Sequence, residues 1–572
     1  MAVTSAAGCG CGGDGDGDRL SALSDGVLGH ILSFLPAKEA ARAAVLSSRW
    51  CHTFAAVHTV SLVEPDAPVV DHDEFAGYSS GWGPPPNPNP PPPPFASAVS
   101  AALLARHRHA AAVPLRALRV SMAGYAHRDS PAVDQWIAYA VNQPAPDGVE
   151  LDLRLGRPSL CHRDYSLRRR RSGAEDARSR RWRTMPPEAI LFESPSSGEE
   201  DHADDEDDDD VLSDDGKKDP MAVYRRRFEP QEYSVPRGLF TCAALRSLSL
   251  GSVRLALPAA AAIALPSLET LLLADVTEPD HERSMQRLIS GCPRLADLTL
   301  EACYAKARAL SVAGLRRLRR LALRCCHGLD TVVLGDDDAS PPSELQAFEY
   351  RGEVPDDFFL VTTTKHGHGV SLETVTVAYC KIDICGDEVT SRSELAMLSA
   401  FLRRFAGVEH LHLASARLGS GLDDAAAFAA LPDLSALRRL ELGGCLPDDD
   451  DTIFAALIRL LDLAPNLEAL SLVFHPEPLD DGDDDDGYRA YCYHKEEELH
   501  DKHLLRRVRE INLVHYQGGT AQRALAMYLL RSAAAIRELR CELAMGPLWI
   551  QDELVREIKG WMMNKAAVIN FG

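Results

Sequence analysis

Leucine and other apolar residues recur in one short pattern along most of the chain after residue 236. The unit is Leu-x-x-Leu-x-Leu, and most successive units begin roughly 23 to 30 residues apart. Alternating apolar residues face one side of a β-strand, and the residues between them face the other side. The pattern therefore predicts a series of short parallel strands. The clearest copies are LRSLSL (245–250), LETLLL (268–273), LADLTL (295–300), LRRLAL (318–323), LETVTV (372–377), VEHLHL (408–413), LRRLEL (437–442) and LEALSL (467–472).

Looser copies extend this series toward both ends of the chain. They are LQAFEY (345–350), VREINL (508–513), IRELRC (536–541), LRALRV (115–120) and VELDLRL (149–155). Helical stretches such as 278–293 and 451–465 lie between strands, and each ends at a proline that cannot continue a helix. One repeat cannot bury its own apolar face, so the repeats must stack. The sequence predicts an α/β leucine-rich-repeat solenoid with parallel strands and a helical convex side.

A second apolar pattern, at helical spacing, lies near the start of the chain. Ser24 can cap a first helix, Pro36 stops it, and two further helices are predicted through 37–45 and from about residue 47. Gly26 and Gly29 each weaken the first helix by roughly 1 kcal/mol relative to Ala, so packing must hold it. Its apolar residues are Val27, Leu28, Ile31, Leu32 and Leu35.

These three helices are too short to bury their own apolar face, because segments below about 40 residues rarely fold without help. A partner is the favoured cover, since the proline run 84–94 separates the helices from the repeats as a stiff spacer. The alternative is that the three helices cap the N-terminal end of the solenoid.

Charge and cysteine content narrow the function classes. The formal net charge is −23, much of it in acidic runs near 200–210 and 480, which argues against nucleic acid or a membrane as partner. The 14 cysteines are scattered and are read as reduced thiols. Neither CGC (9–11) nor CCH (325–327) has a second ligand pair nearby, so no metal or cofactor is expected.

The sequence indicates a chain without enzymatic chemistry of its own. It has no Gly-x-Ser-x-Gly elbow, no P-loop and no dinucleotide-binding glycine motif after a strand. The first residues lack the apolar core of a signal peptide, which favours the nucleus and/or the cytoplasm. The arginine-rich run 168–183 has the character of a nuclear import signal.

Residues 18–54, DRLSALSDGVLGHILSFLPAKEAARAAVLSSRWCHTF, resemble the plant type of F-box. Ser24 stands where that family normally has proline. Residues 503–543 are similar to the FBD-type ending of such proteins, with Tyr516 and Gly518 where a Phe and a Gly usually occur. The resulting domain prediction is F-box 18–58, Pro-rich linker 59–96, first repeats 97–155, charged disordered insertion 156–235, repeats 236–500 with an acidic loop 479–487, FBD-like repeats 501–545 and a tail helix 546–572.

The resemblance implies a substrate-recognition subunit of an SCF-type ubiquitin ligase. In this class of protein the F-box docks on a Skp-family adaptor, and through it on cullin, while the repeats hold a protein target. The implied adaptor-binding residues are Leu23, Leu28, Ile31, Leu32, Leu35, Pro36, Val45, Leu46 and Trp50.

The surface predicted to bind a target consists of outward-facing strand residues, because an open concave sheet is where solenoids usually bind. Two alternatives stay open: a small-molecule receptor of F-box/repeat type, and an F-box scaffold that acts outside a ligase. The predicted target-binding residues are Asp297, Glu301, Arg320, Arg324, His410, His412, Arg439, Glu441, Asn512 and Arg540.

Overall fold

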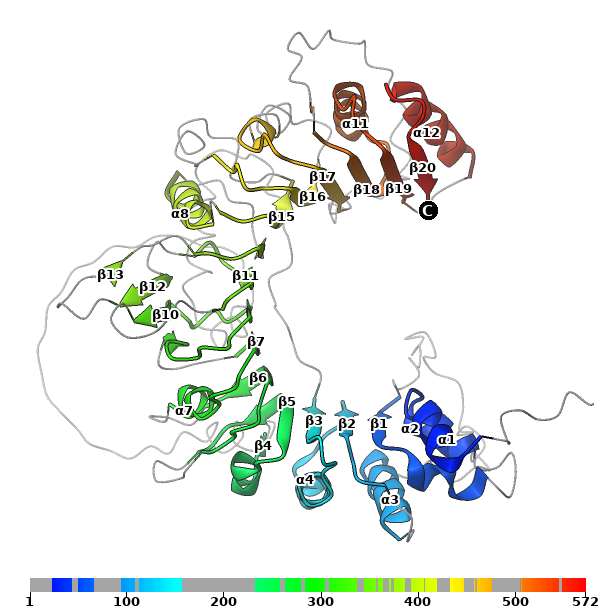
Figure 1. The fold of residues 1–572 in the computed structure, drawn as a ribbon, viewed down its shortest axis with the longest axis vertical. Coiled ribbons are helices and arrows are strands. Elements are labelled where there is room, and N and C mark those ends of the chain that lie inside the picture. Colours follow the sequence, from blue (N-terminus) through cyan, green and yellow to red (C-terminus); the bar gives the residue numbers. More distant parts are fainter. Residues whose placement is uncertain are drawn as a thin grey trace, which may run out of the picture.

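One curved parallel sheet organises the molecule, and its strands line the inner side of an open arc (Figure 1). The structure is a computed structural model. It describes residues 23–43, 50–65, 94–108, 113–156, 232–257, 263–278, 283–303, 308–336, 344–355, 359–363, 370–371, 375–385, 392–405, 407–418, 433–446, 457, 460–475, 505, 507–544 and 548–572. The structure does not describe the proline run 84–93, the acidic loop 479–487 or the insertion 157–231, which contains the arginine-rich run.

The sheet runs in chain order from one end of the arc to the other, and all its pairings are parallel. This order is the mark of a solenoid, in which each repeat contacts only its neighbours. Its strands are β1 (Thr59–Val63), β2 (Ala117–Met122), β3 (Val149–Leu155), β5 (Leu245–Arg254), β6 (Thr270–Thr277), β7 (Asp297–Glu301), β9 (Arg320–Arg324), β11 (Ala347–Gly352), β14 (Tyr379–Ile384), β15 (His410–Arg417), β16 (Arg439–Cys445), β17 (Ala469–Phe474), β18 (Glu510–Tyr516), β19 (Glu538–Leu543) and β20 (Val568–Phe571), with β4 (Tyr233–Ser234) beside β5.

Helices cover the outer side of much of the arc (Figure 1). The core lies between them and the sheet, where the repeat leucines such as Leu248, Leu271 and Leu298 are fully buried. The helices are α1 (Asp25–Leu32), α2 (Ala37–Ala43), α3 (Phe95–His107), α4 (Ser130–Asn142), α7 (Ser284–Ser290), α8 (Arg392–Arg403), α11 (Thr520–Ser532) and α12 (Leu548–Trp561), with 3-10 segments η1 (Trp50–Ala56), η2 (His127–Asp129) and η4 (Arg237–Thr241). Within the described residues, none of these helices has the length and apolar content needed to cross a membrane.

The middle of the convex side differs from the predicted helical cover. A second sheet stands there, formed by β8 (Ala309–Ser311), β10 (Thr331–Asp336), β12 (Leu360–Thr363) and β13 (Val370–Ser371). Runs such as TVV (331–333) and LVTT (360–363) are rich in β-branched residues, which favour strands over helices. The solenoid is therefore confirmed, but within the described residues the helices of its convex side lie on the flanks of this second sheet.

One repeat was predicted in the wrong register. LETVTV (372–377) was read as a strand, but the strand is β14, and Val377, Cys380 and Ile382 supply its Leu-x-x-Leu-x-Leu positions. Cys380 is fully buried and acts as a small apolar residue. The pattern was hidden because a cysteine stands where a leucine was sought.

The sheet is also longer at both ends than the sequence indicated. Residues 59–63 were assigned to the linker but form β1, which pairs with β2, and Phe95 and Ala96 begin α3. Residues 546–572 were predicted as a tail helix, but α12 is followed by β20, which pairs with β19. These edge strands are short, so their alternation was too brief to stand out.

The N-terminal helices lie on the end of the sheet and not on a tether away from it. α2 and η1 contact each other, α2 contacts β1, and η1 contacts α3. Leu32, Ala40 and Val57 belong to the same buried cluster as the repeat leucines. The predicted separation by a proline spacer is wrong, because that spacer follows β1 and so lies after the first strand of the solenoid.

Candidate functional site

Helix α1 carries two apolar stripes that face in different directions. Leu28 and Leu32, one helical turn apart, point inward and are 1% and 3% exposed. Gly29 lies against η1 so closely that a Cβ at this position would sit 2.4 Å from the backbone oxygen of Ala56. The glycine that weakens the helix in isolation is therefore what lets it approach η1.

The second stripe of α1 remains on the surface. Val27 and Ile31 are 45% and 39% exposed, and Phe34 and Leu35, just after the helix, are 76% and 41% exposed. Pro36 is exposed beside them. The described residues include nine large apolar side chains that are exposed, and four of the nine are Val27, Ile31, Phe34 and Leu35. An apolar patch of this kind at one end of a molecule marks an interaction surface.

The predicted adaptor-binding residues divide between these two stripes. Ile31, Leu35 and Pro36 are exposed, and Leu23 is half-buried. The expectation for Leu28 and Leu32 is wrong in this structure, because both are sealed inside the chain and offer no surface. Val45, Leu46 and the side chain of Trp50 lie outside the described residues. Val27 and Phe34 were not among the predicted docking residues, although Val27 was noted in the helical pattern.

Two contacts hold this apolar end on the solenoid. The buried guanidinium of Arg106 on α3 donates to the backbone oxygen of Val57 (3.1 Å), to the hydroxyl of Tyr139 (2.6 Å) and to the backbone oxygen of Val113. Its side chain thereby ties α3 to α4 and to the segment between η1 and β1.

The second contact is a pair of histidines between α1 and β1. His30 Nδ1 lies 3.0 Å from His58 Nε2, and the backbone amide of His58 donates to the hydroxyl of Ser33 (3.3 Å). Burial lowers the pKa of His58, and the nearby positive charge of Arg116 lowers it further. A neutral His58 is therefore the form that suits this junction.

The concave face carries all ten residues predicted to bind a target. The parallel register of the sheet aligns them in three rows across β7, β9, β15, β16, β18 and β19. The first row contains Asp297, Arg320, His410 and Arg439, the second His412, Glu441, Asn512 and Arg540, and the third Glu301 and Arg324.

Four of these residues are joined through a residue that the sequence analysis missed. Glu349 on β11 accepts from Arg320 (2.8 Å) and from Arg324 (2.7 Å), and its side chain is 11% exposed. Arg320 also pairs with Asp297 (3.3 Å), and Arg324 with Glu301 (3.7 Å). The strand of Glu349 was found only as the loose copy LQAFEY, so its outward position drew no attention.

This network fixes the charge of Glu349. Burial alone would raise the pKa of this carboxyl, but hydrogen bonds from Arg324 and Arg320 outweigh burial and hold the pKa below its usual range. Arg320 has a raised pKa despite its own burial, because Glu349 and Asp297 stabilise its charge. The middle of the concave face is thus a charge-paired surface with two half-exposed guanidinium groups.

Pairs of polar residues continue toward the C-terminal end of the concave face. His412 Nδ1 lies 3.0 Å from Glu441 Oε1, and this contact lowers the pKa of Glu441. Arg540 pairs with Glu538 (2.8 Å), and Asn512 donates to Glu510 (3.3 Å). Polar, paired and half-exposed side chains of this kind are typical of a surface that binds another protein.

Several cysteines follow the repeat and serve packing. Cys303, Cys326, Cys385 and Cys445 each stand three residues after the last position of their Leu-x-x-Leu-x-Leu unit, at the Asn/Cys position of a leucine-rich repeat. The Cys303 thiol donates to the backbone oxygen of Leu273 (3.2 Å), and burial raises its pKa well above the usual value. A thiol in this state is not a nucleophile.

Comparisons with known proteins match both halves of this arrangement. Residues 20–58 match the F-box domain, and residues 213–338 match the leucine-rich repeats of the FBD-associated F-box protein At5g56370. The chain is also similar to the F-box/FBD/LRR-repeat protein At5g56420 of Arabidopsis thaliana, with 28% identity over 240 residues. That alignment covers 42% of this chain and about half (49%) of the relative. The matched F-box includes α1, α2 and η1.

Proposed function

Since this chain is a plant-type F-box/leucine-rich-repeat protein with an FBD region, we propose that it is a substrate-recognition subunit of an SCF-type ubiquitin ligase. In this proposal the exposed stripe of α1 docks on a Skp-family adaptor, which connects it to cullin. The concave face holds the target protein. The chain brings the target and the ubiquitin-carrying enzyme together, which raises the effective concentration of one near the other.

The observation that carries the proposal is the exposed apolar patch of Val27, Ile31, Phe34 and Leu35 inside the F-box match. Burying a large apolar side chain contributes about 1.5–3 kcal/mol, so leaving four in water is costly for a lone protein. A second protein that covers the patch recovers this free energy. The paired, polar concave face supports the second half of the proposal.

A binding measurement with the recombinant adaptor tests the docking surface. The double change Ile31→Glu and Leu35→Glu places two charges in the patch without touching the buried core. We expect the dissociation constant for the adaptor to rise more than about 100-fold, since central apolar residues of an interface each contribute about 2 kcal/mol or more. Isothermal calorimetry or biolayer interferometry measures this change.

The matched control is Leu104→Glu, because Leu104 on α3 is 47% exposed and lies outside the F-box. This variant should bind the adaptor as the parent does. Unchanged adaptor affinity in the Ile31/Leu35 variant would refute the docking surface. Cullin recovered together with the adaptor favours the ligase, whereas adaptor without cullin favours a scaffold.

A small-molecule receptor finds less support in the structure. Such a receptor needs a pocket lined by aromatic and cationic side chains on the concave face. In the described strands from β7 to β19, Tyr379 is the only Phe, Tyr or Trp in the three rows of aligned outward residues. Many cationic side chains there are already paired with carboxylates.

A further inference from the structure

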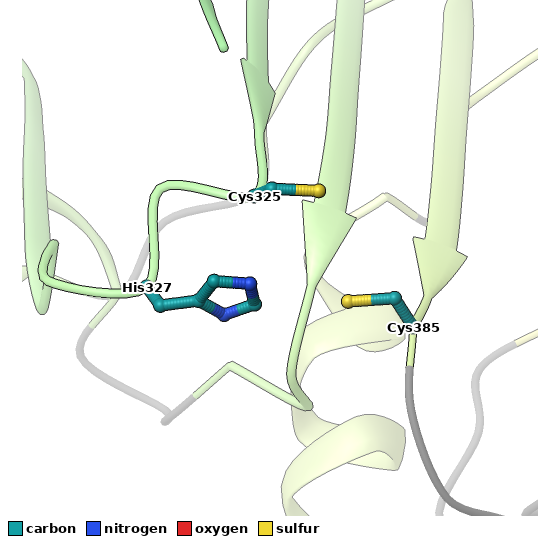
Figure 2. A group of neighbouring side chains, drawn as sticks. All are labelled: Cys325, His327 and Cys385. Atoms are coloured by element: carbon teal, nitrogen blue, oxygen red, sulfur yellow. The ribbon is translucent and has the colours of Figure 1, made fainter. Parts of the chain in front are cut away.

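Two sulfur atoms and an imidazole nitrogen converge at the ends of two strands in the middle of the arc (Figure 2). Cys325 follows β9, His327 lies in the loop after it, and Cys385 follows β14. The potential ligand atoms of all three lie within 4.8 Å of one another. Within the part of the chain that the structure describes, this is the only such group of three His, Cys, Asp or Glu side chains.

The backbone holds both cysteines in place from the strand between them. β11 lies between β9 and β14, and it ends at the buried Gly352. The amide of Cys325 donates to the backbone oxygen of Arg351 (2.6 Å), and the amide of Cys385 donates to that of Gly352 (2.9 Å). A Cβ on Gly352 would sit 2.6 Å from the hydroxyl oxygen of Tyr350, so this position has no room for a side chain. The position of the sulfur atoms is thus set by the sheet and not by a loop.

The repeat explains only one of the two cysteines. Cys385 stands at the same position as Cys303 and Cys326, where a buried thiol is ordinary. Cys325 stands one residue earlier, in a turn with φ of 54°. Other repeats make this left-handed turn with different residues, namely Ser252, Asp275 and Ala302. The turn belongs to the fold, but a thiol in it, followed by a histidine, occurs in this repeat alone among these four.

The electrostatic surroundings favour a cation bound through the histidine. His327 Nδ1 lies 3.8 Å from the carboxylate of Glu353, and a ring nitrogen of His327 is turned toward the two sulfur atoms (Figure 2). A carboxylate behind a ligating imidazole fixes the ring and raises its basicity. Both cysteines are buried, at 5% and 4% exposure, whereas His327 opens to solvent and leaves an entry path.

We propose that Cys325, His327 and Cys385 bind one zinc ion. Thiolate and imidazole are the ligands zinc prefers, and a water completes the tetrahedron. At bond lengths of about 2.3 Å to sulfur and 2.0 Å to nitrogen, the ligand atoms of a tetrahedral site are about 3.5–3.8 Å apart. The cluster needs to contract by about 1 Å to reach this geometry, and the exposed side chain of His327 can supply much of that movement.

Binding converts both thiols to thiolates and releases two protons, so the metal and its two sulfur ligands are together neutral. The ion would clip β9 to β14 across the end of β11. The segment that carries Cys325 and His327 leads from β9 into β10 of the second sheet. The role of the clip would be to stiffen the concave face next to Glu349.

Metal titration of the reduced full-length protein, without a histidine tag, tests the proposal. After removal of metal with a chelator, we expect one equivalent of Co²⁺ to bind and to produce a sulfur-to-cobalt charge-transfer band and tetrahedral visible bands. Zn²⁺ should then displace it. His327→Gln and Cys385→Ser should each weaken binding at least about 100-fold, because one of three protein ligands is lost.

Two further variants separate the ligands from their surroundings. Cys326→Ser, which changes the cysteine between two of the ligands in sequence, should keep the cobalt spectrum. Glu353→Gln should weaken binding about 10- to 100-fold, the usual effect of removing a carboxylate behind a ligating histidine. His327→Gln changes an exposed residue, so its loss of binding cannot be attributed to unfolding.

Three outcomes would overturn the site. The first is the absence of a cobalt spectrum in the reduced parent protein. The second is an unchanged spectrum in both His327→Gln and Cys385→Ser. The third is a Cys325–Cys385 disulfide that forms readily while the reduced protein takes up no metal, which would assign the two thiols to redox chemistry.

Discussion

The two ends of the arc are closed in different ways. At the C-terminal end, α12 turns Leu554 and Ile558 inward, at 2% and 0% exposure, and Met562 just after the helix is 3% exposed. The other side of α12 is charged, with Arg556 and Lys559 exposed. At the N-terminal end, α1 also turns two leucines inward, but its outer side carries Val27 and Ile31 in place of charges.

This difference supports the proposal that the N-terminal end is an interface, although Met563 and Val568 are also exposed at the C-terminal end. A solenoid that ends in water needs a terminal unit with a polar outer face, and α12 supplies one. α1 satisfies the sheet below it and then presents a second apolar stripe outward. The end of a solenoid does not require that second stripe, which agrees with the proposal that another protein covers it.

At both ends, a glycine nevertheless allows the terminal helix to pack closely against its neighbour. The glycine lies in the helix itself at the N-terminal end and in the neighbouring segment at the C-terminal end. Gly29 lets α1 approach Ala56, and Gly518 lets α12 approach, since a Cβ on Gly518 would sit 2.4 Å from Leu554. Gly518 also has a φ of +75°, which favours glycine. The ends differ in the polar contact that accompanies this packing.

The largest expected effect contrasts the two arginines of these ends. Arg106→Met should cost about 2–4 kcal/mol of local stability, because the backbone oxygens of Val57 and Val113 lose a buried donor. Arg540→Met near the other end should change stability little, since the side chain of Arg540 is 62% exposed in its pair with Glu538.

Hydrogen exchange measures the local stability of both ends separately in each variant, because distant repeats open independently. Loss of protection in α3 and β1 is expected for Arg106→Met, with α11 and α12 unaffected. Equal losses at the two ends, or none at the N-terminal end, would contradict the role assigned to Arg106.

A smaller effect is expected from the two packing glycines. Gly518→Ala should cost about 2–3 kcal/mol, from overpacking against Leu554 together with the left-handed backbone. Gly29→Ala should cost about 1–2 kcal/mol, because overpacking exceeds the roughly 1 kcal/mol gained in helix propensity.

Gly26→Ala is the matched control for Gly29→Ala. Both glycines lie in α1, but a Cβ on Gly26 meets nothing within 4 Å, so this variant should be stabilised by up to about 1 kcal/mol. Denaturant unfolding followed by exchange of α1 measures the difference. Stabilisation by Gly29→Ala as well as by Gly26→Ala would show that α1 is not seated on η1.

The smallest effect is a pH dependence confined to the N-terminal end. His58 has a pKa below its usual 6.5, so the unfolded segment binds a proton more readily than the folded one. Stability from this site is therefore complete above pH 6.5 and is lost as the pH falls below that value toward the lowered pKa of the folded state. The facing groups that shape this response are His30, Arg116 and Arg106.

Exchange of α1 measured between pH 7 and pH 5.5 checks this sign. α1 should lose protection as the pH falls, and His58→Asn should flatten the change. Residues 548–572 contain no histidine and should not respond over this range. Increased protection of α1 at low pH would contradict a neutral His58.

Most of the fold could be predicted because the spacing of the leucines along each strand indicates which residues are buried. The exceptions share a cause. β14 was misplaced because Cys380 fills a leucine position, and β1 and β20 are too short to reveal alternation. The second sheet was missed because the convex side was predicted to be helical, so its β-branched runs were not interpreted as strands.

The candidate sites divide in the same way. The sequence placed Ile31 and Leu35 in the docking face, but it could not separate them from Leu28 and Leu32. All four recur at helical spacing, and only the position of η1 and β1 decides which stripe is covered. Glu349 was missed because its role depends on hydrogen bonds from Arg320 and Arg324, which lie on the neighbouring strand β9.

The sequence by itself determined the solenoid, its strand rows and the apolar N-terminal helix, because these follow from the spacing of residues along one strand or one helix. Tertiary structure alone decided which stripe of α1 stays in water and which cysteine meets His327. Cys385 is remote from Cys325 in sequence, and only the stacking of β9, β11 and β14 brings their sulfur atoms together. Spacing along a chain specifies faces, whereas contact between faces depends on how the repeats stack.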